Sequence, residues 1–365
     1  MNGQLPRWVD YGLIPLINVT IAFFVAGLVV IAIGENPLDV VRIMLRGALG
    51  YGEGVGFTLY YATDFIFAGL AVAVAFHAGL FNIGGEGQAT IAGLGVALVC
   101  LALNGQPWWL VAPLAIVAAM VFSAAWAYVP GALQAYRGSH IVINTIMFNF
   151  IATSAMVYLL THVLKPMGQM APETRTFDVA TRLPFMKDYI TPLGYDLGQS
   201  PLNLSILIAA AACVLVYLLI WRTRLGYALR TVGTNPTAAL YAGIDPKRIT
   251  VIAMIISGAL VGLIAINEVM GTHHRLFLGF TGGAGFVGIA VALMGRSHPI
   301  GIALAALLFG MLYQGGAELA FEKPTITRDM IVAIQGLVIL FAGALEHMFR
   351  PALERMFITA RAATA

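Results

Sequence analysis

Long apolar segments without charged side chains constrain this chain more than any other feature. Segments 13–33, 202–221 and 249–267 contain no acidic or basic residue. Each has about 20 residues, the length of helix that crosses roughly 30 Å of hydrocarbon. Charged residues make up only 10% of the 365-residue chain, whereas a soluble domain has about 25%. The sequence therefore predicts an all-α integral membrane protein, with residues 1–365 forming a single transmembrane domain.

Ten segments qualify as membrane spans by this criterion, of which the third and the eighth are short. An even number of spans places both termini on the same side of the membrane. The predicted spans are 13–33, 57–80, 88–104, 107–129, 141–164, 202–221, 249–270, 282–295, 299–319 and 330–349.

The distribution of positive charge indicates which side that is. Segment 222–248 carries five basic residues and one acid, and the tail after residue 349 adds three arginines. Because cytoplasmic loops are enriched in Lys and Arg, we expect this segment and both termini to be cytoplasmic. Segment 165–201, with four basic and four acidic residues, is then an external loop. Arg42 and Arg46 also fall outside, where an amphipathic surface helix over 37–49 would accommodate them.

The two halves of the chain share a glycine pattern. The third predicted span of each half opens with the same spacing, at residues 84–87 (GGEG) and 282–285 (GGAG). With five spans in each half, such a repeat would be inverted in the membrane, and paired glycine-broken segments are typical of a transport pathway. The alternative is coincidence, because small residues also serve close packing between membrane helices.

The predicted cytoplasmic loop 222–248 contains a short helix with sharp ends. Asn235 is a good helix cap and Pro236 suits the first helical position. Gly243 then supplies a left-handed stop, and Asp245 with the proline after it begins the next helix. The segment could be a knob that docks into a partner's groove. It could equally be a surface connector whose charges only set topology.

Several catalytic and cofactor motifs are absent from the sequence. No lysine follows a glycine, so there is no P-loop, and neither HExxH nor CxxC occurs. Cys100 and Cys213 lie alone in apolar stretches. We therefore predict no catalytic residue, no cofactor and no metal in this chain, which would be a transport subunit and not an enzyme. If transport uses ATP, another subunit must supply the ATPase.

Four stretches resemble a known family. Residues 81–88 read FNIGGEGQ, which is similar to the FNIGAEGQ signature of permease subunits in nucleoside-type ABC importers, within the ribose and branched-chain amino acid permease superfamily. Segments 138–149, 225–244 and 283–295 resemble further stretches of the same family, in the same order. Two departures stand out, because Gly85 replaces the usual alanine and Ile141 replaces an expected glutamate.

The resemblance implies a type II ABC importer in a bacterial inner membrane. In such a complex two permease chains, here expected to be different, form the pathway through the lipid bilayer. Separate ATP-binding subunits dock below, an extracytoplasmic binding protein delivers the solute, and no nucleic acid is involved. The coupling residues then map onto Asn235, Pro236, Ala238, Ala239, Leu240, Tyr241 and Gly243.

Polar and aromatic residues within the spans are the candidates for the translocation path. Amide-rich walls and aromatic faces suit an uncharged nucleoside, although the same polar groups could simply bond helix to helix. For Glu86 the structural alternative is a charged cap at the N-terminus of a broken helix. The candidates are Asn82, Glu86, Gln88, Asn144, Asn149, Asn267, Phe280, Phe286 and Gln314.

Other functions remain open at this point. A simple-sugar permease of the same superfamily is the nearest alternative. An ion-coupled secondary transporter would need paired intramembrane acids, for which Asp64 and Glu268 could serve, but it would leave the capped loop without a role. A membrane-embedded enzyme is disfavoured, because the sequence shows no nucleophile–base pair and no metal-ligand spacing.

Overall fold

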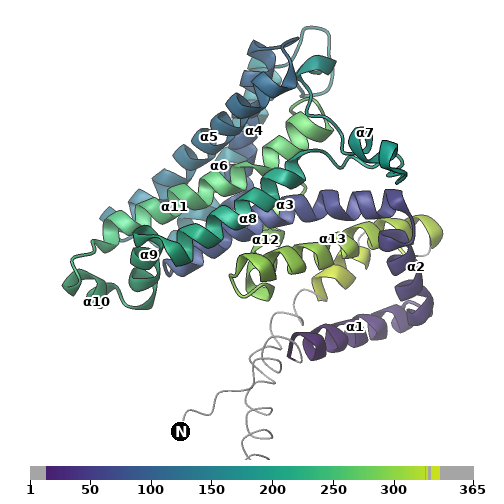
Figure 1. The fold of residues 1–365 in the computed structure, drawn as a ribbon, viewed down its shortest axis with the longest axis horizontal. Coiled ribbons are helices and arrows are strands. Elements are labelled where there is room, and N and C mark those ends of the chain that lie inside the picture. The colour runs from purple at the N-terminus through teal and green to yellow at the C-terminus, as the bar shows by residue number, and fades with distance from the viewer. Residues whose placement is uncertain (1–13, 325, 328–329, 338–365) are drawn as a thin grey trace, which may run out of the picture. The chain divides into compact units, whose positions relative to one another are not determined.

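The structure is a computed structural model that describes residues 14–324, 326–327 and 330–337. These residues are helical throughout apart from their connections, with two isolated β-bridges between loops. Contacts divide the chain into a larger unit, Tyr51–Gly310, and a smaller unit made of Met1–Gly50 and Met311–Ala365. The main helices in Figure 1 are α1 (Ile14–Ala32), α2 (Pro37–Leu49), α3 (Gly52–His77), α4 (Gly85–Ala102), α5 (Trp108–Arg137), α6 (Ile141–Tyr158), α8 (Ser205–Arg222), α9 (Arg224–Thr234), α10 (Pro236–Tyr241), α11 (Pro246–Gly262), α12 (Ala284–Met294) and α13 (Pro299–Glu322).

Seven of the ten predicted spans correspond to helices long and apolar enough to cross a membrane. In the described residues these are α3, α4, α5, α6 with its π-helical end, α8, α11 with the following π-helix, and α13. The first predicted span is α1, which is bent by 117° against α2, and this pair could form an eighth span. The span predicted over 282–295 is the shorter helix α12. Of the span predicted over 330–349, residues 330–337 are helical and the rest lies outside the described residues.

Helix α3 forms the centre of the larger unit. Most of its residues are buried, and α11, α12 and α8 pack along it. Small residues bring the surrounding helices close together, as between α5 and α11, which lie side by side in Figure 1. A side chain at Gly258 of α11 would lie 2.5 Å from the Ala127 Cβ on α5. Ser123 of α5 also donates a hydrogen bond of 2.6 Å to the Gly258 carbonyl. Close backbone contact of this kind is how helices associate where water provides no driving force.

The smaller unit contains the helix predicted over 37–49. Helix α2 spans these residues, with Asn36 as its cap and Pro37 at its first position. The Asn36 side chain accepts a hydrogen bond of 3.0 Å from the Leu38 N–H, so the local signals were sufficient to set where the helix begins. Within the same unit, Lys323 forms an ion pair of 3.0 Å with Glu35.

The segment predicted as an external loop, 165–201, contains only short helical turns. These are a 3-10 turn at Val179–Thr181, a single α-turn α7 at Lys187–Ile190, and a second 3-10 turn at Thr191–Leu193. The loop is fastened to the chain that follows α11, because Glu173 pairs with Arg275 at 3.1 Å and the Thr174 N–H donates to the Leu276 carbonyl at 2.9 Å.

Candidate functional site

The two glycine-rich breaks that the sequence pairs are in direct contact in the folded chain. Helix α4 begins at Gly85 and α12 begins one residue after Gly283. A Cβ on Gly85 would lie 3.2 Å from the Gly285 carbonyl oxygen, and a Cβ on Gly285 would overlap the backbone of Gly85 and Glu86. Further along α4, Gly93 packs against Leu276 and Phe280, which precede α12. Helix α4 therefore runs back along the chain that enters α12, so the two helices meet head to head at their N-termini.

Glu86 joins the two breaks. One carboxylate oxygen accepts hydrogen bonds from the Thr281 hydroxyl and from the Gly283 N–H at 3.1 Å. The other accepts from the Gly285 N–H at 3.0 Å. Gly283, the cap residue of α12, has a φ of +83° and no side chain with which to cap. Glu86 lies in the first turn of α4 but caps α12, a partner that its position in the sequence did not indicate.

The predicted path residues Asn82, Gln88 and Asn149 surround this junction, and all three are buried. Asn149 accepts from the Gly87 N–H at 2.9 Å and donates to the Ile83 carbonyl at 3.0 Å. Asn82 bonds to both the Gly84 N–H and the Gln88 amide. In this conformation Asn82 and Asn149 therefore satisfy the irregular backbone of the first break, and Gln88 holds the Asn82 side chain in place, so that these buried polar groups are paired.

The other predicted path residues are more widely spread. Phe280 is buried against Gly93 of α4, and Phe286 on α12 is 47% exposed. Asn144, near the start of α6, is half-buried and donates to the Ser139 hydroxyl. Gln314 is buried and belongs to the smaller unit. The remaining candidate, Asn267, lies in a separate polar cluster described below.

Helix α10 forms a small projecting knob. Asn235 caps it through hydrogen bonds of 3.0 Å from the N–H groups of residues 237 and 238, and Gly243 ends it with a φ of +75°. Ala239 is its one buried residue, whereas Leu240 and Tyr241 are 60% and 91% exposed. Pro236 and Ala238, which were also predicted as coupling residues, are exposed and complete this surface. The cap, the stop and the two-turn length all follow from the sequence pattern.

The knob is attached to the segment that leads into the first break. Helix α9 precedes α10 directly, and its Gly233 packs so closely that any side chain would overlap the His77 carbonyl and the Gly79 nitrogen. His77 in turn contacts the Ser297 carbonyl at 3.1 Å and the ring of Trp221. Residues 77–79 thus connect α9 at one end and the glycine break of α4 at the other.

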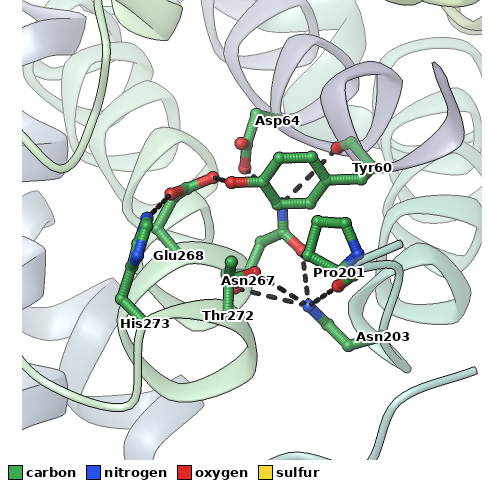
Figure 2. Close-up of polar contacts among 8 residues, drawn as sticks. All are labelled: Tyr60, Asp64, Pro201, Asn203, Asn267, Glu268, Thr272 and His273. Atoms are coloured by element: carbon green, nitrogen blue, oxygen red, sulfur yellow. Dashed lines mark hydrogen bonds and ion pairs between the residues drawn. The ribbon is translucent and has the colours of Figure 1, made fainter. Parts of the chain in front are cut away.

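A buried polar cluster lies at the π-helical segment η5 (Ile266–Thr272), which follows α11 (Figure 2). Tyr60 donates to one oxygen of Glu268, and the His273 ring nitrogen lies 3.1 Å from the other. Asn267 donates to Asp64 at 3.0 Å and accepts from Asn203 at 2.9 Å. The sequence flagged Asp64, Asn267 and Glu268 as polar groups in apolar spans. It gave no signal for Tyr60, Asn203 or His273, which lie on three different segments.

Comparison with known proteins decides the class of the chain. The family described as branched-chain amino acid transport system / permease component matches residues 54–343. The chain belongs to this permease family. It is a multi-pass membrane protein, as the apolar helices require. The predicted resemblance to ABC importer permeases is confirmed.

Three relatives of this permease are similar over most of their length. The guanosine ABC transporter permease NupP of Bacillus subtilis is 34% identical over 91% of this chain and 93% of its own. The nucleoside ABC transporter permease NupB of Lactococcus lactis is 33% identical, with 88% and 89% covered. The glucose ABC transporter permease TsgB13 of Haloferax volcanii is also 33% identical, with 95% and 90% covered.

Proposed function

We propose that this permease is one of two membrane chains of a type II ABC importer and that it moves nucleosides into the cell by alternating access. The choice of nucleosides as the substrate rests on the two relatives named as nucleoside and guanosine permeases, at 33% and 34% identity. The complex would sit in the bacterial inner membrane, with both termini cytoplasmic. A second, different permease chain and an extracytoplasmic binding protein complete it, and the latter meets the loop 165–201.

Helix α10 is the proposed contact with a separate ATPase subunit. Two exposed apolar side chains, Leu240 and Tyr241, project from a short helix fixed at both ends. Apolar anchors of this kind suit a groove on a partner. When ATP binding closes the ATPase domains, α10 and α9 move together. Gly233 then passes the motion to residues 77–79 and so to the break before α4.

The junction of α4 and α12 is the proposed pivot of the translocation path. Helices that meet head to head at glycine breaks support the inverted repeat of two five-span halves, ten spans in all. Free helix N-termini would favour an anionic solute. Here the Glu86 carboxylate already accepts hydrogen bonds from the N–H groups of Gly283 and Gly285. The junction therefore favours an uncharged solute, such as a nucleoside, over a nucleotide or an amino acid carboxylate.

A simple sugar is the second candidate substrate. Glucose is also uncharged, and the glucose permease TsgB13 is as similar to this chain as the nucleoside permeases are. The Glu86 carboxylate does not discriminate between two uncharged solutes, so a competition experiment must.

Co-purification tests the proposed docking. The ATPase subunit should co-purify with the wild-type permease and be lost from the variant with both Leu240→Glu and Tyr241→Glu. The matched control carries Leu193→Glu and Tyr195→Glu, which change an exposed leucine and an exposed tyrosine in the loop 165–201. Retention of the ATPase by the α10 variant, or equal loss in both variants, would refute docking at α10.

A further inference from the structure

The cluster in Figure 2 contains two carboxyl groups, Asp64 and Glu268, and His273 is the basic side chain that contacts them, through Glu268. Asp64 and Glu268 are 4% and 5% exposed and lie next to each other on α3 and η5. Among the described residues neither forms an ion pair with lysine or arginine, and no group of side chains there could hold a metal. Two adjacent buried carboxylates cannot both be ionised without a positive charge beside them. The cluster must therefore bind a proton, either on one of the two carboxyl groups or on His273, which lies 3.1 Å from Glu268.

The hydrogen-bond donors around the pair can be assigned from the backbone. The Ser205 N–H can only donate, and it donates to the Asn203 side-chain oxygen at 3.0 Å. The Asn203 amide nitrogen must then donate to the Asn267 oxygen, which also accepts from the Ser205 hydroxyl at 2.7 Å. This fixes the Asn267 nitrogen as the donor to Asp64. The relay supplies Asp64 with one hydrogen bond and no charge.

His273 connects the pair to solvent. Its side chain is 37% exposed, and its ring nitrogen lies 3.1 Å from Glu268. Glu268 is also in the first turn of η5, and π-helical turns of this kind recur at functional sites. We propose that Asp64 and Glu268 bind one proton between them and that His273 exchanges this proton with the solution.

The surroundings leave few other groups that could neutralise the site. Tyr60 on α3 donates to Glu268, Tyr61 packs against the Tyr60 ring, and the facing residues of segment 201–205 do not titrate. After η5, His274 bonds the Met270 carbonyl and Arg275 is paired with Glu173. Helices α4, α5 and α8, which also pack against η5, carry their ionised side chains at their opposite ends, as Glu86, Arg137 and Arg222.

The proton site is positioned to act on the translocation path. Loss of the proton would place two negative charges between α3 and η5. The chain after η5 runs through Leu276 and Phe280, which pack against α4, and enters the break that Glu86 caps. Deprotonation therefore loosens the segment that holds the junction of α4 and α12. This inference does not rest on the proposed substrate, and failure of nucleoside uptake would leave it standing.

Infrared spectroscopy of the purified full-length chain in lipid nanodiscs tests the proposal. We expect the wild type to show a protonated carboxyl C=O band that disappears as the pH is raised. The near-isosteric variants Asp64→Asn and Glu268→Gln should each abolish the titrating band, whereas Asp188→Asn, an exposed control, should not. Absence of the band from the wild type, or its persistence in both cluster variants, would overturn the proposal.

Two further readouts keep the test independent of how well the variants fold. Because the folded wild type holds a proton that the unfolded chain has lost, its unfolding constant should rise by up to about tenfold per pH unit between about pH 4, where an unfolded carboxyl group ionises, and the pH at which the band disappears. A flat profile there would contradict the shared proton. In a His273→Gln variant the band should remain, but hydrogen–deuterium exchange at the carboxyl should slow. An unchanged exchange rate would rule out His273 as the route.

Discussion

Replacing Glu86 by glutamine removes the negative charge from the junction of α4 and α12 while keeping the length of the side chain. The new carbonyl oxygen can still accept from Thr281 and Gly283, but the amide group then faces the Gly285 N–H, which is also a donor. Loss of a hydrogen bond to a charged group costs about 1.5–3 kcal/mol, and loss of the favourable charge at a helix N-terminus costs about 0.3–1 kcal/mol more. We therefore expect Glu86→Gln to reduce the free energy of unfolding by roughly 2–4 kcal/mol.

Thermal melting of the purified chain in nanodiscs measures this effect. The expected loss corresponds to a fall in melting temperature on the order of 5–10 °C for a unit of this size. Thr281→Val is the matched comparison, because it removes one donor but keeps the carboxylate and both backbone hydrogen bonds, at a cost of about 1 kcal/mol. If Glu86→Gln melts no lower than Thr281→Val, the Glu86 charge does not stabilise the junction of α4 and α12. A variant that melts like the wild type but transports nothing would instead indicate that Glu86 contacts the solute.

Three further predictions follow from individual contacts. Gly285→Ala should reduce the free energy of unfolding by about 1–3 kcal/mol, because the new Cβ overlaps the backbone of the first break, whereas Gly85→Ala, whose Cβ comes no closer than 3.2 Å to other atoms, should melt close to the wild type. Equal melting temperatures for the two variants would contradict the packing of the two breaks. Asn235→Ala should destabilise α10 by about 1 kcal/mol, which speeds amide hydrogen exchange at the start of that helix and reduces co-purification of the ATPase. Asn235→Asp should restore slow exchange and co-purification, and unchanged amide exchange in Asn235→Ala would exclude the cap. Burial holds the pKa of His274 below its ordinary value, so the unfolded chain binds this proton first and the melting temperature should fall as the pH drops below about 6.5. His274→Asn, in which asparagine tolerates the φ of 55°, should reduce this fall, and an unchanged fall would assign it to another group.

Local features of the fold were predictable because they depend on neighbouring residues. Apolar runs set the seven long helices, and the capping asparagines and following prolines set the starts of α2 and α10. Glycine stops act within a residue or two of where they occur, as Gly243 does. Such signals need no knowledge of the rest of the chain.

The contacts between distant segments could not be predicted in the same way. The glycine spacing indicated that two breaks correspond, but not that they touch, and Glu86 bonds to residues about 200 positions away. The cluster around Asn267 needs α3, segment 201–205 and a π-helix to come together. A π-helix of seven residues is too short to show its side-chain period in the sequence, so the Asn-Glu pair indicated only polar groups in an apolar run.

Uptake of a labelled purine nucleoside tests the central claim most directly. Cells that lack this permease but contain its partner subunits would be compared with and without restoration of the chain, using unlabelled nucleoside and unlabelled ribose or glucose as competitors. We predict that restoration returns uptake, that unlabelled nucleoside blocks it and that the sugars do not. Uptake that is not restored, or that sugars block and nucleosides do not, would contradict nucleoside import by this permease.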